Sequence, residues 1–289
     1  MKKLNVGFIG LGLMGLPMAK NILKKKYPLT AWSRSKKNYK AIQKLGATTC
    51  QNFMDLPNKC QIIIMMLIDD KICMQISSRL KNKLKEGQIL IDMSSTKKKT
   101  SIKIEKNIKS RKAYFLDAPV SGGTIGAEKA KLAIMVGGQK RLFNKVKTLL
   151  NTMGKATYVG KTGSGQVAKL ANQAIVGITI GAVSEALILA EAAGANPKAV
   201  REAIKAGFAG SPILENHGKR ILNRNFKPGG KCSTQLKDMN NIIETARDHN
   251  IQLPISNKIK NLYATIVREG KSNLDHSALY LLLKKFKKH

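Results

Sequence analysis

Acidic residues are scarce in this chain. Only 17 Asp and Glu accompany 52 Lys and Arg over 289 residues, so the formal net charge is +35, and Arg occupies just nine of the basic positions. Such a surplus suits anionic partners, including nucleic acid and membrane surfaces. The basic residues are scattered along the whole chain, however, and an excess of Lys over Arg is typical of compositional drift. We therefore expect no specific nucleic-acid partner, with a selected attraction to anions as the open alternative.

Paired cysteines are also absent. Cys50, Cys60, Cys73 and Cys232 show neither a C-x-x-C motif nor any paired spacing, so the sequence predicts no metal site and no disulfide framework. The first strand-like run begins at Leu4, which leaves no room for a cleaved targeting segment. Together these features favour a reduced, cytoplasmic compartment.

Long apolar runs are rare. One stretch, Leu170–Ala190, could span a bilayer by its length, but polar side chains interrupt it at Asn172, Gln173, Ser184 and Glu185. Both of its flanks belong to globular patterns. We expect a central buried helix here, and no membrane partner.

The first half of the chain alternates apolar strand-like runs with amphipathic stretches. Apolar runs separated by helices are typical of a parallel sheet covered on both faces, and right-handed crossovers then give a doubly wound Rossmann-type α/β domain. The predicted strands are Asn5–Ile9, Leu29–Trp32, Ile62–Met66, Ile89–Asp92, Tyr114–Asp117, Leu132–Val136 and Thr157–Val159. The predicted helices include Pro17–Lys26, Lys36–Leu45, Lys71–Leu84 and Leu142–Met153.

The second half has almost no strand pattern. A long helix is predicted from about Gln166 to Ala193, with Gly177 and Gly181 on it at a spacing that would let another helix approach closely. Shorter helices are predicted over Pro197–Ala206, Ser211–Leu222, Thr234–His249, Pro254–Glu269 and Ser277–Lys285. The sequence thus predicts a Rossmann domain over residues 1–163 and an all-α C-terminal domain over residues 164–289.

A glycine motif follows the first predicted strand and opens a helix, which is the context that a dinucleotide-binding fingerprint requires. It consists of Gly10, Leu11, Gly12, Leu13, Met14 and Gly15. Gly10 permits the tight turn, Gly12 lets the backbone approach a pyrophosphate, and Gly15 allows close helix–strand packing. The helix N-terminus then faces the anion.

The cofactor preference is expected at the end of the second predicted strand. An NAD-binding protein would place a carboxylate there for the ribose 2′-hydroxyl. This chain has Ser33, Arg34 and Ser35 instead, and a guanidinium flanked by hydroxyls suits a 2′-phosphate. We therefore favour NADP(H) as the cofactor, with NAD(H) as the alternative.

Two further segments carry candidate site residues. After the strand that ends at Asp117, Ser121 and the amides of Gly122 and Gly123 could form a nest for a carboxylate. Lys169 and Asn172 are one turn apart near the start of the long helix, so they share a face. The helix dipole disfavours a cation there, which should lower the pKa of Lys169 and help proton transfer.

These segments resemble the β-hydroxyacid dehydrogenases, the family that includes 3-hydroxyisobutyrate dehydrogenase and tartronate semialdehyde reductase. The resemblance runs nearly end to end and rests on four ordered segments, Gly10–Asn21, Asp117–Gly123, Gly160–Asn172 and Lys237-Asp238-Met239. One departure is Ala130, where the family usually has glycine. If that backbone requires a positive φ, alanine costs about 1 kcal/mol.

The resemblance implies a role for each candidate residue. Lys169 would be the catalytic acid/base, Asn172 would position the substrate, and Ser121, Gly122 and Gly123 would hold its carboxylate. Leu67, Thr96 and Lys237 would line the nicotinamide and ribose side of the cofactor site. The expected reaction is the NADP(H)-dependent reduction of a small semialdehyde, such as tartronate semialdehyde, succinic semialdehyde or glyoxylate, to its hydroxy acid.

Two alternatives stay open. One is an NAD-dependent 3-hydroxyisobutyrate dehydrogenase. The other is a non-catalytic, nucleic-acid-associated scaffold, because the family includes a chromatin-associated member that lacks the catalytic lysine.

We also expect a homodimer or homotetramer held by the helical region. The helices there are more apolar than one copy can bury. The apolar residues include Leu279, Leu281, Leu282 and Leu283 near the end, and Gly177 and Gly181 form a face for close packing.

Overall fold

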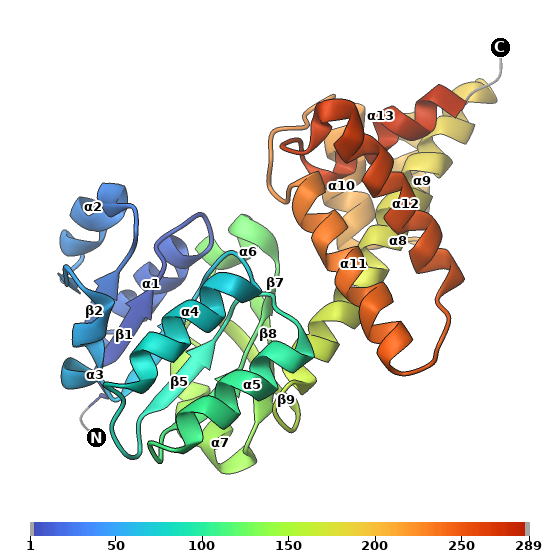
Figure 1. Cartoon of the computed structure of the whole chain (residues 1–289). Coiled ribbons are helices and arrows are strands. Elements are labelled where there is room, and N and C mark those ends of the chain that lie inside the picture. The colour runs from blue at the N-terminus through green and yellow to red at the C-terminus, as the bar shows by residue number, and fades with distance from the viewer. Residues whose placement is uncertain (1–2, 287–289) are drawn as a thin grey trace. The chain divides into compact units, whose positions relative to one another are not determined.

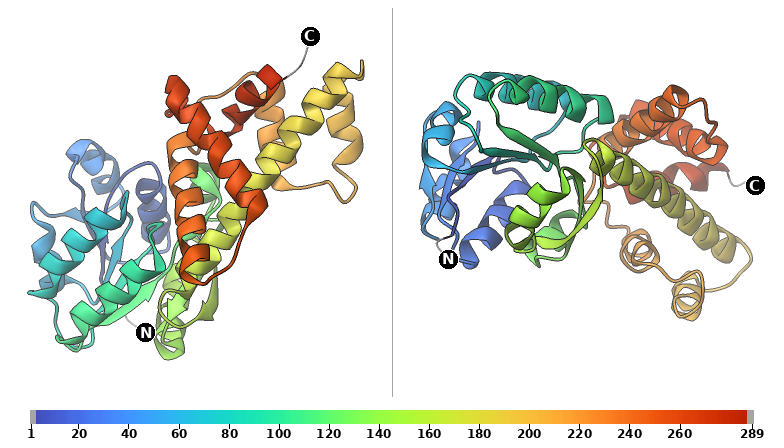
Figure 2. Two further views of the ribbon diagram at one scale, coloured as in Figure 1. Left: turned by 45° about the vertical axis from the view of Figure 1, so that its right-hand side comes forward. Right: turned by 90° about the horizontal axis from the view of Figure 1, so that it is seen from below.

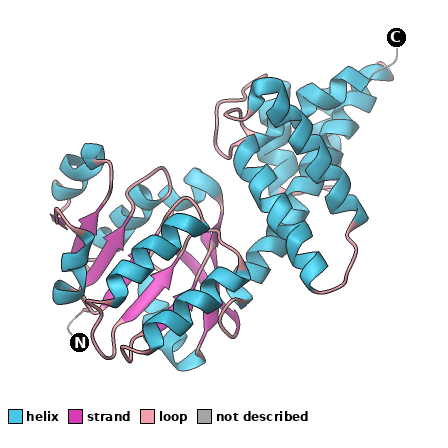
Figure 3. Ribbon diagram, in the orientation of Figure 1, coloured by secondary structure: helices cyan, strands magenta, loops and turns pink. Residues whose placement is uncertain are grey.

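The computed structural model describes residues 3–286 and consists of two compact units, one ending at Lys169 and the other beginning at Leu170. Within the described residues the strands all lie in the first unit, and the second is helical (Figures 1 and 3). The boundary between the units falls inside α8 (Ser164–Ala192). The division at residue 163 and the assignment of the whole of α8 to the second domain stay predictions.

The sheet of the first unit runs in the order β3-β2-β1-β4-β5-β6-β8-β7, with β9 paired to β8. The order therefore reverses beside β1, which makes the carboxyl ends of β1 and β4 the switch point where dinucleotides bind in such sheets. The strands are β1 (Val6–Ile9), β2 (Leu29–Trp32), β3 (Thr48–Thr49), β4 (Ile62–Met65), β5 (Ile89–Asp92), β6 (Tyr114–Asp117), β7 (Val120–Ser121), β8 (Leu132–Gly138) and β9 (Gly154–Gly160).

Helices cover both faces of this sheet (Figure 2). Successive residues of one strand belong to different cores: Ile62 and Ile64 pack on one face, and Ile63 packs on the other. One face is covered by α1 (Gly15–Lys24), α2 (Tyr39–Gln43), α6 (Gly123–Glu128) and α7 (Lys140–Leu150). The other is covered by α3 (Leu56–Lys59), α4 (Asp70–Lys81) and α5 (Lys98–Lys109). The doubly wound α/β prediction is therefore confirmed.

The sheet departs from the predicted parallel arrangement at one edge. β8 pairs antiparallel with β6 and β7, and parallel with β9. The connection from β7 to β8 contains only the short α6, whereas a parallel crossover needs a dozen or more residues. β3 and β7 were not predicted, because two-residue strands are too short to show a period.

The second unit contains the remainder of α8 and five further α-helices among the described residues. These are α9 (Pro197–Ile204), α10 (Pro212–Leu222), α11 (Cys232–Asp248), α12 (Pro254–Ile266) and α13 (Leu279–Leu283). Proline occupies the first turn of α9, α10 and α12, where its missing N–H has no intrahelical partner to lose. The predicted all-α domain is confirmed.

The small-residue face of α8 is filled by this chain's own helices. A Cβ at Gly177 would lie 2.8 Å from Gln235 Nε2, and one at Gly181 would lie 2.8 Å from Ile259 Cδ1. The close helix approach was predicted correctly, but the partners are α11 and α12. Leu279, Leu282 and Leu283 are likewise buried in the core of this unit. None of these residues is therefore available as an oligomer face.

Among the described residues, α8 is the one helix long and apolar enough to cross a membrane, by length and composition alone. Three of its apolar side chains, Ile180, Val183 and Leu187, are buried in the second unit. This burial is what the core helix of a globular protein requires. All four cysteines are free and buried.

Candidate active site

The glycine loop has the geometry that its sequence predicts. Gly10 has a φ of +103°, and a Cβ there would lie 2.2 Å from the Met66 carbonyl oxygen. A Cβ at Gly15 would lie 1.9 Å from the Gly10 carbonyl oxygen, so α1 can pack onto β1 only with glycine at this position. A Cβ at Gly12 would meet nothing within 4 Å. Gly10 and Gly15 are thus required by the protein itself, whereas Gly12 borders open space.

Ser33 and Arg34 lie just past the end of β2, beside the glycine loop. The buried Ser33 hydroxyl accepts a hydrogen bond of 3.3 Å from the Leu11 N–H, so it supports the loop. Arg34 and Ser35 are exposed. Of the three predicted residues, Arg34 and Ser35 therefore present their side chains to solvent, while the Ser33 hydroxyl is buried and hydrogen-bonded within the chain.

Leu67 and Thr96 follow β4 and β5, the next two strands along the sheet from β1. The Leu67 N–H donates to Ser94 Oγ at 2.9 Å, and the Thr96 N–H donates to Gln166 Oε1 at 3.0 Å. Gln166 in turn donates through Nε2 to the Ser94 carbonyl at 2.9 Å. The Thr96 hydroxyl is buried and has no hydrogen-bond partner among the described residues.

Asp117 fixes the beginning of α8. Its carboxylate accepts hydrogen bonds from the N–H of Gly163 at 2.7 Å and the N–H of Gln166 at 2.9 Å. These are donors that a helix start leaves without intrahelical partners. Burial raises the pKa of Asp117, while the hydrogen bonds from Gly163 and Gln166 oppose that rise. No role was predicted for Asp117 or Gln166, although an acid at the end of a buried strand is a recognisable sequence signal.

The predicted carboxylate nest lies between β6 and α6. Gly122 and Gly123 have φ values of +133° and +61°, which favour glycine, and Gly123 begins α6. The helix ends in a turn at Ala130, whose φ is +54°. The positive φ considered for Ala130 is therefore present, and the alanine is strained there.

Lys169 and Asn172 lie one turn apart on α8. In the second unit, Asn172 Nδ2 donates to Gln173 Oε1 at 2.9 Å, and Gln173 Nε2 donates to Asp238 Oδ2 at 2.8 Å. Lys237 Nζ is 3.6 Å from Asp238 Oδ1. The predicted residues of the second unit, Asn172 and Lys237, are thus linked through Asp238.

Asp92, which was not predicted as a site residue, is a buried carboxyl at the end of β5. Burial raises its pKa to about 7, the hydrogen bonds from Ser94 lower it, and the charge of Asp117 raises it further. Asp92 Oδ1 accepts from the Ser94 N–H at 3.0 Å, whereas Oδ2 is buried without a hydrogen-bond partner. A neutral carboxylic acid fits this environment better than a carboxylate.

The first unit therefore brings most of the predicted residues to one edge of the sheet. Four adjacent strands end at this edge. Arg34 follows β2, the glycine loop follows β1, Leu67 follows β4 and Thr96 follows β5. The open space at Gly12 and the unpartnered hydroxyl of Thr96 fit a bound dinucleotide. The first turn of α1 contains no acidic residue, so its N–H groups and dipole suit a phosphate.

Comparisons with known proteins give relatives over nearly the whole chain. Residues 5–162 match a family model described as the NAD binding domain of 6-phosphogluconate dehydrogenase, and residues 163–283 match the NAD-binding model of NADP-dependent 3-hydroxyisobutyrate dehydrogenase. The chain is 38% identical to 2-hydroxy-3-oxopropionate reductase of Escherichia coli (strain K12), over 99% of both chains. It is 28% identical to glyoxylate/succinic semialdehyde reductase 1 of Arabidopsis thaliana, over 96% of this chain and 97% of that one.

A solved structure shares the fold. The 3-hydroxyisobutyrate dehydrogenase of Mycobacterium tuberculosis superposes with a TM-score of 0.89 at 23% identity, covering 98% of this chain and 99% of that one. The family models between them span nearly the whole chain. The chain therefore belongs to the β-hydroxyacid dehydrogenase family and is an NAD(P)-dependent enzyme of that family.

Proposed function

We propose that the enzyme reduces a small semialdehyde of the 2-hydroxy-3-oxopropionate type to its hydroxy acid, with NADPH as the reductant and Lys169 as the general acid. The observation that carries this proposal is the identity of 38% to 2-hydroxy-3-oxopropionate reductase over 99% of both chains. Such a level over the full length supports a shared reaction class. The related semialdehyde reductase of Arabidopsis thaliana supports the same class of substrate.

The residues of this chain divide the reaction between binding and proton transfer. When bound, NADPH supplies a hydride to the aldehyde carbon. Ser121 and the amides of Gly122 and Gly123 bind the substrate carboxylate, and Asn172 orients the carbonyl group. Lys169 Nζ gives a proton to the carbonyl oxygen as negative charge develops there, so the product is a neutral alcohol. The resulting lysine amine then takes a proton from solvent.

The local structure supports the assignment of Lys169. Asp117 holds the first turn of α8 through two hydrogen bonds, at Gly163 and Gln166. Gln166 is further tied to Thr96 and Ser94. A lysine one turn after such a fixed start has a backbone with little freedom, and a proton donor must be held in place to act.

For the cofactor, we propose NADPH over NADH. The exposed guanidinium of Arg34 follows β2 beside the glycine loop, where a 2′-phosphate would require a cation. No Asp or Glu stands at Ser33, Arg34 or Ser35 to accept a hydrogen bond from a 2′-hydroxyl. An NAD-dependent 3-hydroxyisobutyrate dehydrogenase is the alternative that this composition disfavours.

Steady-state kinetics with tartronate semialdehyde, succinic semialdehyde, glyoxylate and methylmalonate semialdehyde test the substrate class. We expect the highest kcat/KM for tartronate semialdehyde with NADPH. A clear preference for methylmalonate semialdehyde with NADH would contradict both parts of the proposal and favour 3-hydroxyisobutyrate dehydrogenase activity.

We also propose a cytoplasmic homo-oligomer, a dimer or tetramer. Ile175 and Leu189 on α8 are 66% and 69% exposed, which leaves apolar surface that a second copy could cover. Buried free thiols support a reducing compartment. Light scattering at moderate salt tests the assembly, and a particle of only 31.7 kDa, the mass of one chain, would contradict it.

A further inference from the structure

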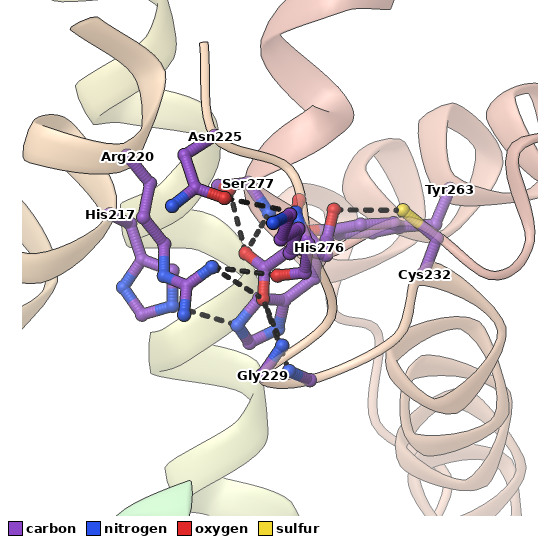
Figure 4. A network of polar contacts seen from close by, with 11 residues as sticks. His217, Arg220, Asn225, Gly229, Cys232, Tyr263, His276 and Ser277 are labelled. Atoms are coloured by element: carbon purple, nitrogen blue, oxygen red, sulfur yellow. Dashed lines mark hydrogen bonds and ion pairs between the residues drawn. The ribbon is translucent and has the colours of Figure 1, made fainter. Parts of the chain in front are cut away.

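Two histidines of the second unit face each other inside a polar network (Figure 4). His217 lies on α10, and His276 begins a short 3-10 turn over His276–Ala278. Their Nε2 atoms are 2.8 Å apart, with the rings edge to face at 64°. A hydrogen bond of this length needs one N–H and one lone pair. A single hydrogen can therefore lie between the two rings.

A chain of side-chain amides connects this pair to Asn172. The Asp238 carboxylate can only accept, so Gln173 must turn its Nε2 toward it and its Oε1 toward Asn172 Nδ2. Gln235 Nε2 donates to the main-chain oxygen of Gln173 at 3.2 Å. Gln235 Oε1 then faces His276 Nδ1 at 3.3 Å. His276 Nδ1 must consequently carry a hydrogen.

With that hydrogen fixed, the pair has two arrangements. If His276 is neutral, His217 donates through Nε2, whether or not its buried Nδ1 also carries a hydrogen. If His276 is a cation, it donates through Nε2 and His217 accepts. A second positive charge on the pair would require an N–H at both Nε2 atoms. These atoms are 2.8 Å apart, so the contact would have to open.

The groups around the pair favour one positive charge and oppose two. Asp275 is buried, which opposes its ionisation, yet the charge of His276 and hydrogen bonds from Ser277, Gly229 and Gly230 hold its pKa below the usual value. Arg220 Nη1 lies 3.8 Å from Asp275 Oδ2 and adds a fixed positive charge. Burial lowers the pKa of His217, with the charge of Asp275 opposing that change.

Tyr263 and Cys232 are two further titratable neighbours of the pair. The Tyr263 hydroxyl donates to the His276 carbonyl oxygen at 3.1 Å, and the Cys232 thiol donates to the Asp275 carbonyl oxygen at 3.3 Å. Burial raises the pKa of both groups, that of Cys232 to about 12. The backbone at Gly230 covers the His276 ring, since a Cβ there would lie 3.2 Å from Cε1.

A metal ion is the other occupant that His217, His276 and Asp275 would suit by composition. Both carboxylate oxygens of Asp275 already accept hydrogen bonds, Oδ1 from Ser277 and Oδ2 from Gly229 and Gly230. Imidazole nitrogens bound to one zinc ion would lie about 3.3 Å apart, given bonds of about 2.0 Å. The separation of 2.8 Å and the nearby guanidinium favour a direct hydrogen bond instead.

We propose that His217 and His276 form a proton-sensitive positioning pair, which holds the amides of Gln235 and Gln173 and so orients Asn172 for the reaction. Neither histidine touches substrate; both act through the intervening amides. The inference rests on the proposed function, because the orientation of Asn172 matters to turnover only if Asn172 orients the substrate.

Two variants of one histidine separate positioning from packing. Asparagine can place its Nδ2 where the imidazole has Nδ1, so His276→Asn keeps the donor to Gln235, whereas His276→Leu removes it. We expect His276→Leu to lower kcat about tenfold at neutral pH with the Kd for NADPH unchanged. His276→Asn should stay within about twofold of the wild type. His249→Asn, at an exposed histidine of the same unit, is the matched control.

The pH profile supplies a readout that packing alone would not move. The wild type should lose kcat in acid, below the ordinary imidazole range, because burial lowers the pKa of His217 and a second proton opens the pair. His276→Asn cannot take that proton and should keep its activity there. Equal kcat for the wild type and a folded His276→Leu, or the same acid loss in His276→Asn, would overturn the inference.

Imidazole ¹⁵N NMR tests the pair without any turnover, and a chain with four histidines gives few signals to assign. At neutral pH, we expect a protonated His276 Nδ1 and a His217 signal that changes in His276→Asn. An unprotonated His276 Nδ1 would overturn the pair as described. A shift of both ring signals on addition of Zn²⁺ at micromolar concentration would also overturn it, in favour of a metal site. If the NMR result holds but no semialdehyde is reduced, the proposed function fails, and the positioning role fails with it.

Discussion

The Asp117 carboxylate accepts a hydrogen bond from the Gln166 N–H at 2.9 Å, and so ties the end of β6 to the first turn of the helix that carries Lys169. A second bond, from the Gly163 N–H at 2.7 Å, occupies the other carboxylate oxygen. The two bonded residues are 49 positions apart in the chain. Since one ends β6 and the other lies in the first turn of α8, the contact links the sheet edge to the helix of the proposed proton donor. It places the backbone of α8 before any substrate binds.

Replacement of Asp117 by asparagine should therefore damage both stability and turnover. The amide presents an NH₂ group to one of the two N–H donors, which leaves that donor buried and unsatisfied. We expect a loss of about 2 kcal/mol in unfolding free energy and a kcat at least tenfold lower. Urea unfolding and steady-state kinetics measure the two effects. Asp248→Asn, at an exposed acid, serves as the control, and wild-type values for Asp117→Asn would contradict the role assigned to this carboxylate.

Replacement of Arg34 by aspartate should shift the preference from NADPH toward NADH. The change removes the cation that would bind a 2′-phosphate and supplies an acceptor for a 2′-hydroxyl. The ratio of kcat/KM values for the two cofactors is the measurement. Lys44→Asp makes the same change of charge at another exposed position and should leave the ratio nearly unaltered. A wild type that already prefers NADH would show that the interpretation of Ser33, Arg34 and Ser35 is wrong.

Replacement of Ala130 by glycine should stabilise the protein. Ala130 has a φ of +54° in the turn that ends α6, a conformation that costs alanine about 1 kcal/mol relative to glycine. Thermal or urea unfolding should show a gain of this size. Ala127→Gly, inside α6, should have the opposite sign because glycine weakens a helix interior. A destabilised Ala130→Gly variant would contradict the strain argument.

Replacement of Asp92 by asparagine should change how stability depends on pH. The pKa of Asp92 is raised from 3.8 to about 7 in the fold, so the native state favours the protonated acid. Its contribution to stability is complete below about pH 4 and declines as the pH rises through 7. The wild type should therefore lose more stability than Asp92→Asn between pH 5 and pH 8 in urea unfolding. Parallel curves for the two proteins would show that Asp92 is ionised in the fold.

The sequence predicts local features of the site well and distant contacts poorly. The glycine motif could be interpreted residue by residue, because its turn and helix start depend on neighbours in the chain. The hydrogen bond between Asp117 and Gln166 could not, because it depends on strand order. Close helix packing at Gly177 was foreseen, but small residues do not identify a partner, and the partner is α11 of the same chain. The contact of His217 with His276 joins residues 59 positions apart and has no sequence signature.

Of the 52 Lys and Arg that give the chain its charge of +35, only Arg34, Lys169 and Lys237 are assigned to the site. Exposed charges are screened over about 8 Å at physiological salt, so they should not prevent oligomer assembly. They should give weak, sequence-independent retention on nucleic acid that falls steeply as salt rises. Duplex binding measured at rising salt tests this expectation. Tight binding that persists at high salt would indicate a selected nucleic-acid partner.

Kinetics of the Lys169→Ala enzyme test the central claim most directly. NADPH titration should give a Kd close to that of the wild type, while kcat for the best semialdehyde falls by about 10² to 10⁴, the range for loss of a general acid. Lys169→Arg should fail similarly, because a guanidinium does not release its proton at neutral pH. A Lys169→Ala enzyme with near-normal kcat would contradict the assignment of Lys169 as the proton donor.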